Sequence, residues 1–458
     1  MENLSQPARR KFLTQSAAAA GCTLLGMAAS GAKAAPVAST ETSASKSTPL
    51  PAHYVLSNVR LEERFIREGG DISATQTGLY SIEINQGKVI QVTAGTLSGS
   101  SLPHVDAQGA LLLPATRDMH IHLDKTFYSG PWQAPMPRKG KTIMDMIARE
   151  QILIPQLLPT SVARAENLIA LLQSKGSTVA RSHCNIDPVS GLKSLEHLQT
   201  ALAKHQSDFS CEIVAFPQHG LLHSNVDALM REAMQMGVQW VGGLDPTNVD
   251  GAMEKSLDAM FQIALDNNKG VDIHLHETTP AGVAAIHYMI DTVEKTPALK
   301  GKLTISHAFA LSTLTPAEVE ETAPRLAAQG ITIASTVPIG RIMMPLPQLY
   351  AHGVNIVTGT DSVIDHWSPF GSGSMLEKAN VFAQLYGYSD EYGLSRALRI
   401  ATGDILPLSN QGERVWPAAG DEANMMLVTA SCSAEAVARI SPVVATFHQG
   451  QKVFGQLS

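Results

Sequence analysis

Two histidines one residue apart follow an apolar run in the segment DMHIHLDKTF, residues 118–127. Imidazole is the commonest metal ligand, and the two-residue period of a strand would aim His120 and His122 the same way, toward one ion. Other apolar runs end in further side chains that bind metals or move protons: His274, Glu277 three residues after it, His307 and Asp361. Three neutral imidazoles and one carboxylate suit Zn²⁺ or Fe²⁺ and leave a position for water.

Each of these features has a plainer explanation when taken alone. Two histidines in an HxH segment are more often half-buried or surface residues than a ligand pair. His274 or His307 could be a hydrogen-bonded core histidine, Asp361 could cap the loop after it, and Glu277 could be a solvated loop acid. Their order along the chain, each at the end of an expected strand, favours the metal site.

The elements that must position these residues alternate between β-like runs and amphipathic helical stretches, which is typical of a parallel sheet or barrel. Eight runs are candidate strands: 111–122, 177–184, 210–216, 238–244, 270–276, 302–308, 331–336 and 354–360. Eight strands predict an α/β fold of the (β/α)8 TIM barrel type, whose chemistry lies at the carboxyl ends of the strands. We also expect helices over 161–175, ending at Gly176, and from Asn225, as a cap, to Gly237.

Short β-like pieces occur at both ends of the chain, before and after this α/β middle. They predict a small β-sandwich assembled from both termini, residues 52–114 and 412–458, beside a metal-dependent barrel over 115–411.

The N-terminal segment has the pattern of a twin-arginine export signal over residues 1–34. Arg9 and Arg10 precede a modest apolar stretch that ends in Ala32-Lys33-Ala34, a small-x-small cleavage site, and a Ser/Thr/Ala/Pro-rich linker follows over 35–51. Lipoprotein processing at Cys22 is the alternative. We therefore expect a periplasmic protein, with the twin-arginine export machinery as a partner.

The composition favours a compact enzyme with a small-molecule partner. Of the 458 residues 44% are hydrophobic and 16% charged, and the net charge is -7 with no basic run outside the first eleven residues. These values argue against a nucleic-acid partner or an anionic membrane surface. No run after the signal approaches the roughly 18 uninterrupted apolar residues of a membrane span, so we expect no membrane association after cleavage. A homo-oligomer is compatible with the sequence.

The order HxH, then His with Glu three further on, then His, then Asp resembles the amidohydrolase superfamily, and within it the bacterial cytosine deaminase branch. Two further segments, AFPQHGL at 215–221 and DSVIDHWSPFGSGSML at 361–376, are similar to that branch. The resemblance implies one divalent metal ion held by His120, His122, His274 and Asp361. It also implies Glu277 as proton shuttle, His307 beside the metal-bound hydroxide, and Gln218 as a reader of the ring amide.

The activity implied is hydrolysis of a non-peptide C–N bond, with deamination of a small nitrogen heterocycle of the cytosine or triazine type by a metal-bound hydroxide. One metal is expected because the segment VQWVGGLDP of the fourth strand offers no bridging lysine or glutamate. Two alternatives stay open: ring-opening hydrolysis of a cyclic amide, and a non-catalytic exported protein that binds a metal or ligand.

Three departures from the cytosine deaminase pattern argue against cytosine itself as the substrate. Ser362 stands where those enzymes have a second aspartate, His276 where they have an acid, and Lys125 where they have threonine; Asp-Lys after HxH resembles aminohydrolases of N-substituted triazines. Lys125, Ser362, Gln218 and Trp367 are therefore candidate substrate contacts. The alternatives are an exposed loop lysine, an amide that only structures its loop, and a tryptophan packed beneath it.

Overall fold

The structure is a computed structural model that describes residues 49–97 and 99–457. The predicted signal peptide, the alternative processing site at Cys22 and the linker up to residue 48 lie outside the described residues. Within the described ranges, none of the helices combines the length and apolar character that crossing a bilayer requires.

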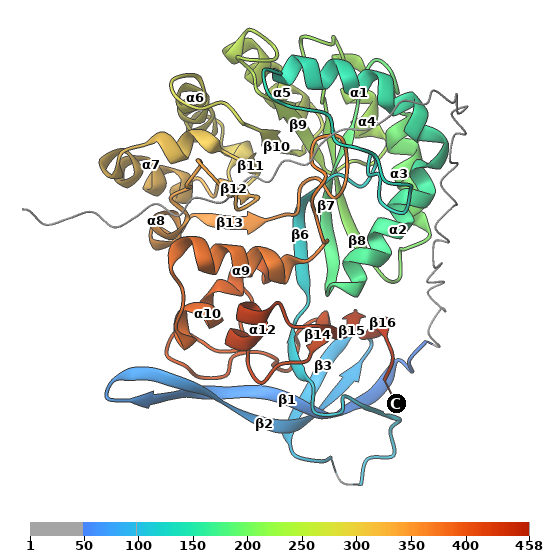
Figure 1. Cartoon of the computed structure of the whole chain (residues 1–458), viewed down its shortest axis with the longest axis vertical. Coiled ribbons are helices and arrows are strands. Elements are labelled where there is room, and N and C mark those ends of the chain that lie inside the picture. The colour runs from blue at the N-terminus through green and yellow to red at the C-terminus, as the bar shows by residue number, and fades with distance from the viewer. Residues whose placement is uncertain (1–48, 98, 458) are drawn as a thin grey trace, which may run out of the picture. The chain divides into compact units, whose positions relative to one another are not determined.

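Eight parallel strands form the sheet that carries the predicted site residues (Figure 1). Each strand pairs with the next one along the chain, in the order expected of a (β/α)8 barrel. The strands are β6 (Thr116–Ile121), β7 (Ser177–Asn185), β8 (Ser210–Phe216), β9 (Trp240–Leu244), β10 (Gly270–His274), β11 (Leu303–Ser306), β12 (Thr332–Ser335) and β13 (Asn355–Thr358). All eight overlap the predicted runs, and the predicted fold class is confirmed.

The last strand meets the first through the residues just beyond β13. The backbone N–H of Asp361 donates to the carbonyl of His120 at 2.7 Å, and the N–H of His122 donates to the carbonyl of Asp361 at 3.3 Å. Gly359 lies at this junction, where a Cβ atom would stand 2.2 Å from the carbonyl oxygen of His120. Only glycine therefore permits this close approach of the two backbones, which brings Asp361 next to His120 and His122.

Helices cover the outside of the barrel strands (Figure 1). Local capping explains where some begin: Thr142 and Asp145 form a capping box at the start of α1, and Thr315 and Glu318 form one at the start of α7. The helices are α1 (Ile143–Leu157), α2 (Ser161–Ser174), α3 (Lys193–Ala203), α4 (Asp227–Gln235), α5 (Met253–Asp266), α6 (Ala281–Lys295), α7 (Pro316–Ala328), α8 (Leu346–Ala351), α9 (Met375–Tyr386), α10 (Glu391–Ala397), α11 (Arg399–Thr402) and α12 (Ser433–Arg439). Short 3-10 turns lie at Leu158–Thr160, Pro297–Leu299 and Phe309–Thr313.

The helix predicted over 161–175 is present as α2, and Gly176 follows it with φ +92°. The predicted cap at Asn225 is wrong. Asn225 has φ +52°, and α4 begins at Asp227 after Val226, which makes no side-chain capping bond. The backbone turns through the left-handed region at Asn225, so its side chain does not reach the first helical N–H groups.

The predicted first strand, 111–122, is two strands in two different sheets. β5 (Leu111–Pro114) pairs antiparallel with β14 (Met425–Val428), whereas β6 joins the barrel. Side chains of β5 alternate accordingly: Leu112 packs in the core of the β domain, and Leu111 and Leu113 pack in the barrel core. A continuous apolar run cannot show this break, because the partner strand comes from the far end of the chain.

Strands from both ends of the chain share one sheet in the β domain. The order is β16-β15-β14-β5-β1-β2-β3, with β4 also paired to β1. The bounds are β1 (His53–Glu68), β2 (Asp71–Asn85), β3 (Lys88–Ala94), β4 (His104–Asp106), β15 (Val443–His448) and β16 (Gln451–Gly455). A separate hydrophobic cluster that includes Tyr54, Ile82 and Phe447 forms the core of this domain.

Candidate metal centre

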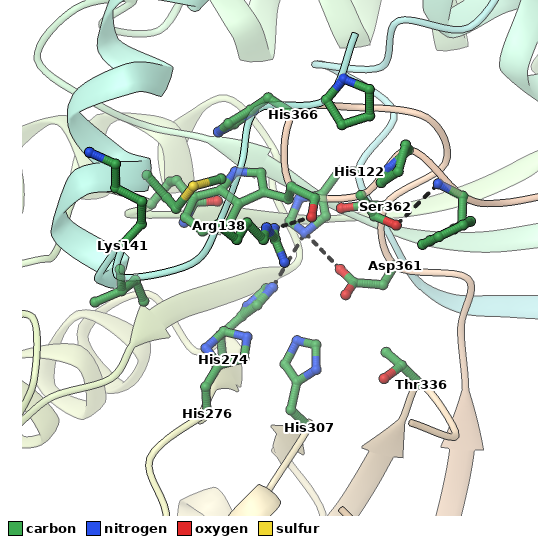
Figure 2. A pocket seen from close by; sticks show the side chains of 18 of the residues that line it. His122, Arg138, Lys141, His274, His276, His307, Thr336, Asp361, Ser362 and His366 are labelled. Carbon is green, nitrogen blue, oxygen red and sulfur yellow. Dashed lines mark hydrogen bonds and ion pairs between the residues drawn. The ribbon is translucent and has the colours of Figure 1, made fainter. Parts of the chain in front are cut away.

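The predicted ligands converge at the carboxyl ends of the barrel strands. Oδ1 of Asp361 lies 3.3 Å from Nε2 of His122 and 3.5 Å from Nε2 of His120, and Nε2 of His274 lies 3.4 Å from Nε2 of His122. Figure 2 shows His122, His274 and Asp361 pointing toward one another, with His307 beside them. Ligand atoms of His120, His274, His307 and Asp361 all lie within 4.8 Å of one another, so strands far apart in sequence supply one cluster.

The tautomer of His122 follows from its hydrogen bond to the backbone. Its Nδ1 lies 3.0 Å from the carbonyl oxygen of His183. A carbonyl oxygen only accepts, so Nδ1 must carry the proton and the lone pair of Nε2 is left facing Asp361. The backbone of β7 thereby presents His122 in the form that ligates a metal.

A buried chain of hydrogen bonds sets the tautomer of His120 in the same way. Ser306 Oγ donates to Oδ1 of Asp272 at 2.6 Å and lies 2.9 Å from Nδ1 of His120. The single hydroxyl proton goes to the carboxylate, so Nδ1 of His120 must donate to the serine oxygen and its Nε2 keeps a free lone pair. The other carboxylate oxygen of Asp272 is held by Arg181 at 3.0 Å.

We expect Ser306→Ala to weaken metal binding about 10- to 100-fold, because His120 loses the bond that fixes its tautomer and ring plane. Metal affinity of the purified chain, measured by competition with a chromogenic chelator, checks this. Ser335→Ala is the matched control, since Ser335 is equally buried on the next strand and contacts the backbone of Val337. Equal affinities for the two variants would contradict the assigned role of Ser306.

Burial holds the remaining imidazoles neutral. Desolvation, reinforced by neighbouring histidines, lowers the pKa of His274 and His307 well below its usual value. Burial acts to raise the pKa of Asp361, but the imidazoles of His120 and His122 that face its carboxylate outweigh burial and hold that pKa well below its usual range. Neutral imidazoles and an ionised carboxylate are the forms that bind a divalent cation.

Two of the predicted site residues have strained backbones. His307 and Asp361 both have φ +64°, in the left-handed region that costs non-glycine residues energy. Such conformations persist where the surrounding structure enforces them, and here they aim both side chains into the cluster.

The residues present fit a single divalent ion. Nε2 of His120 is buried and has no hydrogen-bond partner among the described residues, although a buried imidazole nitrogen is costly to leave unpaired. Three nitrogen donors and one carboxylate oxygen match the ligand preferences of Zn²⁺ and Fe²⁺. At the end of β9, Asp245 is engaged by the backbone N–H of His276 at 2.6 Å and by its Nδ1 at 3.0 Å, which leaves it unsuited to bridge a second ion.

Glu277 is buried beside the predicted ligand His274, with one carboxylate oxygen anchored and the other unpaired. Its Oε1 accepts from the backbone N–H groups of Thr247 at 2.8 Å and Asn248 at 2.6 Å, while Oε2 has no hydrogen-bond partner among the described residues. Desolvation raises the pKa of Glu277, assisted by nearby Asp245 and opposed by the Asn248 bond. A carboxyl group with a raised pKa is suited to proton transfer near neutral pH. The plainer expectation of a solvated loop acid does not describe this residue, which is 2% exposed.

A cavity of about 680 Å³ opens above the cluster. It brings together seven predicted site residues with a rim that the sequence did not single out. The predicted residues that line it are His122, Gln218, His274, His307, Asp361, Ser362 and Trp367. The rim includes Met136, Arg138, Lys141, Phe309, Thr336, His366 and Phe370.

Lys125 does not line this cavity and is not an exposed loop lysine. It is 3% exposed, and its Nζ donates to Oε1 of Gln218 at 2.5 Å, to Asn185 at 3.3 Å and to Glu150 at 3.3 Å. An ammonium group only donates, so the atom of Gln218 that it contacts must be the oxygen. The amide nitrogen of Gln218 therefore remains to face the cavity.

Sequence reasoning missed Glu150, the buried acid that contacts Lys125, Asn185 and Trp367. Its carboxylate accepts from Asn185 at 2.5 Å and from the indole Nε1 of Trp367 at 2.6 Å, and it pairs with Lys125. Burial acts to raise the pKa of Glu150, but Lys125 and His366 outweigh it and hold the pKa below its usual range. The available signal was an acid within the apolar stripe of α1, where Ile147 and Ile154 are buried on either side of it.

We expect Glu150→Gln to destabilise the protein by about 3–5 kcal/mol, because it leaves the buried ammonium of Lys125 without its counter-charge. Urea denaturation measures this free energy of unfolding. The double variant Lys125→Met/Glu150→Gln should recover most of the loss, since both charges are removed. The control Glu166→Gln breaks a surface pair with Lys204 and should cost at most about 1 kcal/mol; an equal loss in Glu150→Gln would contradict the assignment.

The chain is similar to known proteins over most of its length. The family model described as "Amidohydrolase family" matches residues 145–454. The chain is 60% identical over 453 residues to the uncharacterized protein YahJ of Escherichia coli (strain K12), covering 98% of each chain. It is 27% identical to N-isopropylammelide isopropyl amidohydrolase of Pseudomonas sp. (strain ADP), covering 67% of this chain and 76% of that protein.

A solved structure shares the fold as well. The N-isopropylammelide isopropylaminohydrolase of Burkholderia multivorans is 26% identical and superposes with a TM-score of 0.76, covering 88% of this chain and 98% of that one. The matched family model covers most of the barrel and the C-terminal strands of the β domain. The chain belongs to the amidohydrolase family, whose members are hydrolases of C–N bonds.

Proposed function

We propose that this chain is a metal-dependent aminohydrolase that releases ammonia or a substituted amine from a small nitrogen heterocycle of the cytosine or triazine type. The observation that carries the proposal is the approach of Asp361 to His120 and His122, and of His274 to His122, near a buried Glu277 whose pKa is raised by desolvation. Relatives described as acting on N-isopropylammelide support the substrate type.

His120, His122, His274 and Asp361 would hold the ion, Zn²⁺ or Fe²⁺. When bound, such an ion lowers the pKa of water toward about 7 and so supplies a hydroxide nucleophile at neutral pH. The rest of the chemistry belongs to side chains of this chain.

Glu277 would act as the proton shuttle. Its ionised carboxylate can take one proton from the attacking water and deliver it to the ring nitrogen, and it can then take the hydroxyl proton of the addition product and deliver it to the departing amine. Two backbone N–H groups hold Oε1, so the carboxylate keeps one oxygen for proton transfer. His307 would donate a hydrogen bond to the oxygen that adds to the attacked carbon and so stabilise the charge that develops there. Because burial keeps this imidazole neutral, it can donate only from the one ring nitrogen that carries a proton.

Gln218 and Trp367 would orient the heterocycle. Lys125 occupies the oxygen of Gln218, so the amide N–H groups can donate to a ring nitrogen or ring carbonyl of the substrate. The indole of Trp367, fixed by Glu150, supplies an aromatic wall for a planar ring. Ser362 lines the same cavity where the cytosine enzymes have an acid, which leaves room for a substrate other than cytosine.

An amine-release screen of the purified chain tests this function. Pyrimidines, triazines, pterins and creatinine-like rings are each supplied with Zn²⁺, Fe²⁺ or Mn²⁺, and released ammonia or amine is measured alongside the mass of the product. We expect release with the ring intact for at least one heterocycle. Ring opening without amine release would instead assign the chain to cyclic amide hydrolysis, and no turnover of any compound would favour a binding protein.

A further inference from the structure

The charged side chains that line the cavity are distributed unevenly. Asp361 is the only acid among the described lining residues, and it belongs to the metal cluster. The rim carries two cations, Arg138 and Lys141. Figure 2 shows both on the segment that leads into α1, on the opposite side of the view from Thr336.

Neither rim cation forms an ion pair with a carboxylate in the described part of the chain. The guanidinium of Arg138 donates to the backbone carbonyl of Trp367, which holds it at the cavity. Lys141 lies near Asp145, but that carboxylate accepts from the backbone N–H of Thr142 at 2.8 Å and from its hydroxyl at 2.9 Å. The rim therefore carries two cations that have no direct carboxylate partner among the described residues.

Two buried cations near the site are paired with carboxylates, in contrast. Lys125 lies 3.3 Å from Glu150, and Arg181 lies 3.0 Å from Asp272. The chain as a whole has a net charge of -7, so the positive rim is a local feature of the cavity and runs against the overall charge. A cavity lined by one sign of charge concentrates ligands of the opposite sign.

Resting on the function proposed above, we propose that the substrate is a heterocycle that carries an anionic oxygen group, either a carboxylate or an ionised ring oxygen. Arg138 and Lys141 bind this group at the rim while the C–N bond to be cleaved lies at the metal cluster. The planar, two-pronged guanidinium of Arg138 matches a carboxylate or two adjacent ring oxygens. Met136, Phe309 and Phe370 give the space between the two ends apolar walls suited to a flat ring.

Matched pairs of compounds test the charge preference. Cytosine is compared with 5-carboxycytosine, which adds a carboxylate, and melamine with ammelide, whose ring oxygens ionise. We expect kcat/KM to be at least about tenfold higher for the anionic member of one pair, and which pair it is distinguishes the carboxylate from the ring oxygen. Affinities are measured separately by calorimetry, so the charge preference can be determined even for compounds that bind without being hydrolysed.

Variants of the rim locate the effect. Arg138→Gln should lower kcat/KM for the anionic compound about tenfold or more, chiefly through KM, and Lys141→Gln less. Lys139→Gln is the matched control, because Lys139 is an exposed neighbour that does not line the cavity. Raising the salt concentration should shrink the wild-type preference.

Two results would overturn the inference while leaving amine release standing. One is a wild-type preference, in both turnover and affinity, for the neutral member of both pairs. The other is an equal loss for charged and neutral compounds in Arg138→Gln. Failure to release amine from any compound, with tight calorimetric binding of the anionic members, would refute the proposed function and retain the charge preference.

Discussion

Glu277→Gln is expected to lower kcat by about 10²- to 10⁴-fold while the metal content stays at the wild-type level. Glutamine keeps the shape of the side chain and can still accept from Thr247 and Asn248, but it cannot take up and release a proton. Steady-state amine release and metal analysis of the same preparation measure the two effects. Glu254→Gln, which alters an exposed acid on α5, should leave both quantities unchanged.

The dependence of activity on pH provides a second test of the role of Glu277. Glu277 serves as a base only when it is ionised, so activity should fall as the pH drops through its pKa, which desolvation raises above the ordinary carboxyl value. The acid limb of the wild-type profile should therefore lie above that ordinary value and be missing from the residual activity of Glu277→Gln. Full activity in Glu277→Gln, or loss of its metal, would show that Glu277 is not the shuttle.

His274→Ala should abolish metal binding and activity together. The imidazole of His274 is stacked on Phe216, with ring centroids 3.9 Å apart, and its Nε2 faces that of His122. Alanine removes one of four expected donors, so the site loses the imidazole nitrogen that lies 3.4 Å from that of His122 and its affinity for a metal ion falls. Metal stoichiometry after dialysis, with amine release on the same sample, measures the outcome.

The matched control for this variant is His287→Ala, which removes an exposed histidine from α6. It should keep both metal and activity. Circular dichroism of both variants shows whether the fold survives. A folded His274→Ala that still binds stoichiometric metal and turns over substrate would refute the ligand set.

Local sequence patterns were enough to predict the barrel strands and the approach of the candidate metal ligands to one another. Each strand is a short apolar run, and in a parallel barrel the carboxyl ends of all strands meet, so His120, His274 and Asp361 could be expected together without knowing any contact. The division of 111–122 between two sheets could not be expected. It depends on β14, more than three hundred residues away, pairing with β5.

The contacts of the buried residues behind the cavity could not be predicted from the sequence for a similar reason. Lys125 could be recognised as unusual, but its partner Glu150 lies on α1 and reaches it only once the helix packs against the barrel. The left-handed backbones of His307 and Asp361 and the rim position of Arg138 depend on loop conformations that residue types do not determine. Periodicity predicts which face of an element is buried, and it does not predict which side chain on another element meets that face.

The most direct test of the central claim is metal titration of amine release. The purified chain is stripped with a chelator, Zn²⁺ or Fe²⁺ is added back in steps, and released amine is measured on the best heterocycle from the screen. We expect no release from the stripped chain and recovery that saturates at about one ion per chain. Full activity of the metal-free chain, or saturation only at two ions, would contradict the proposal that one metal ion, held by His120, His122, His274 and Asp361, is required for hydrolysis.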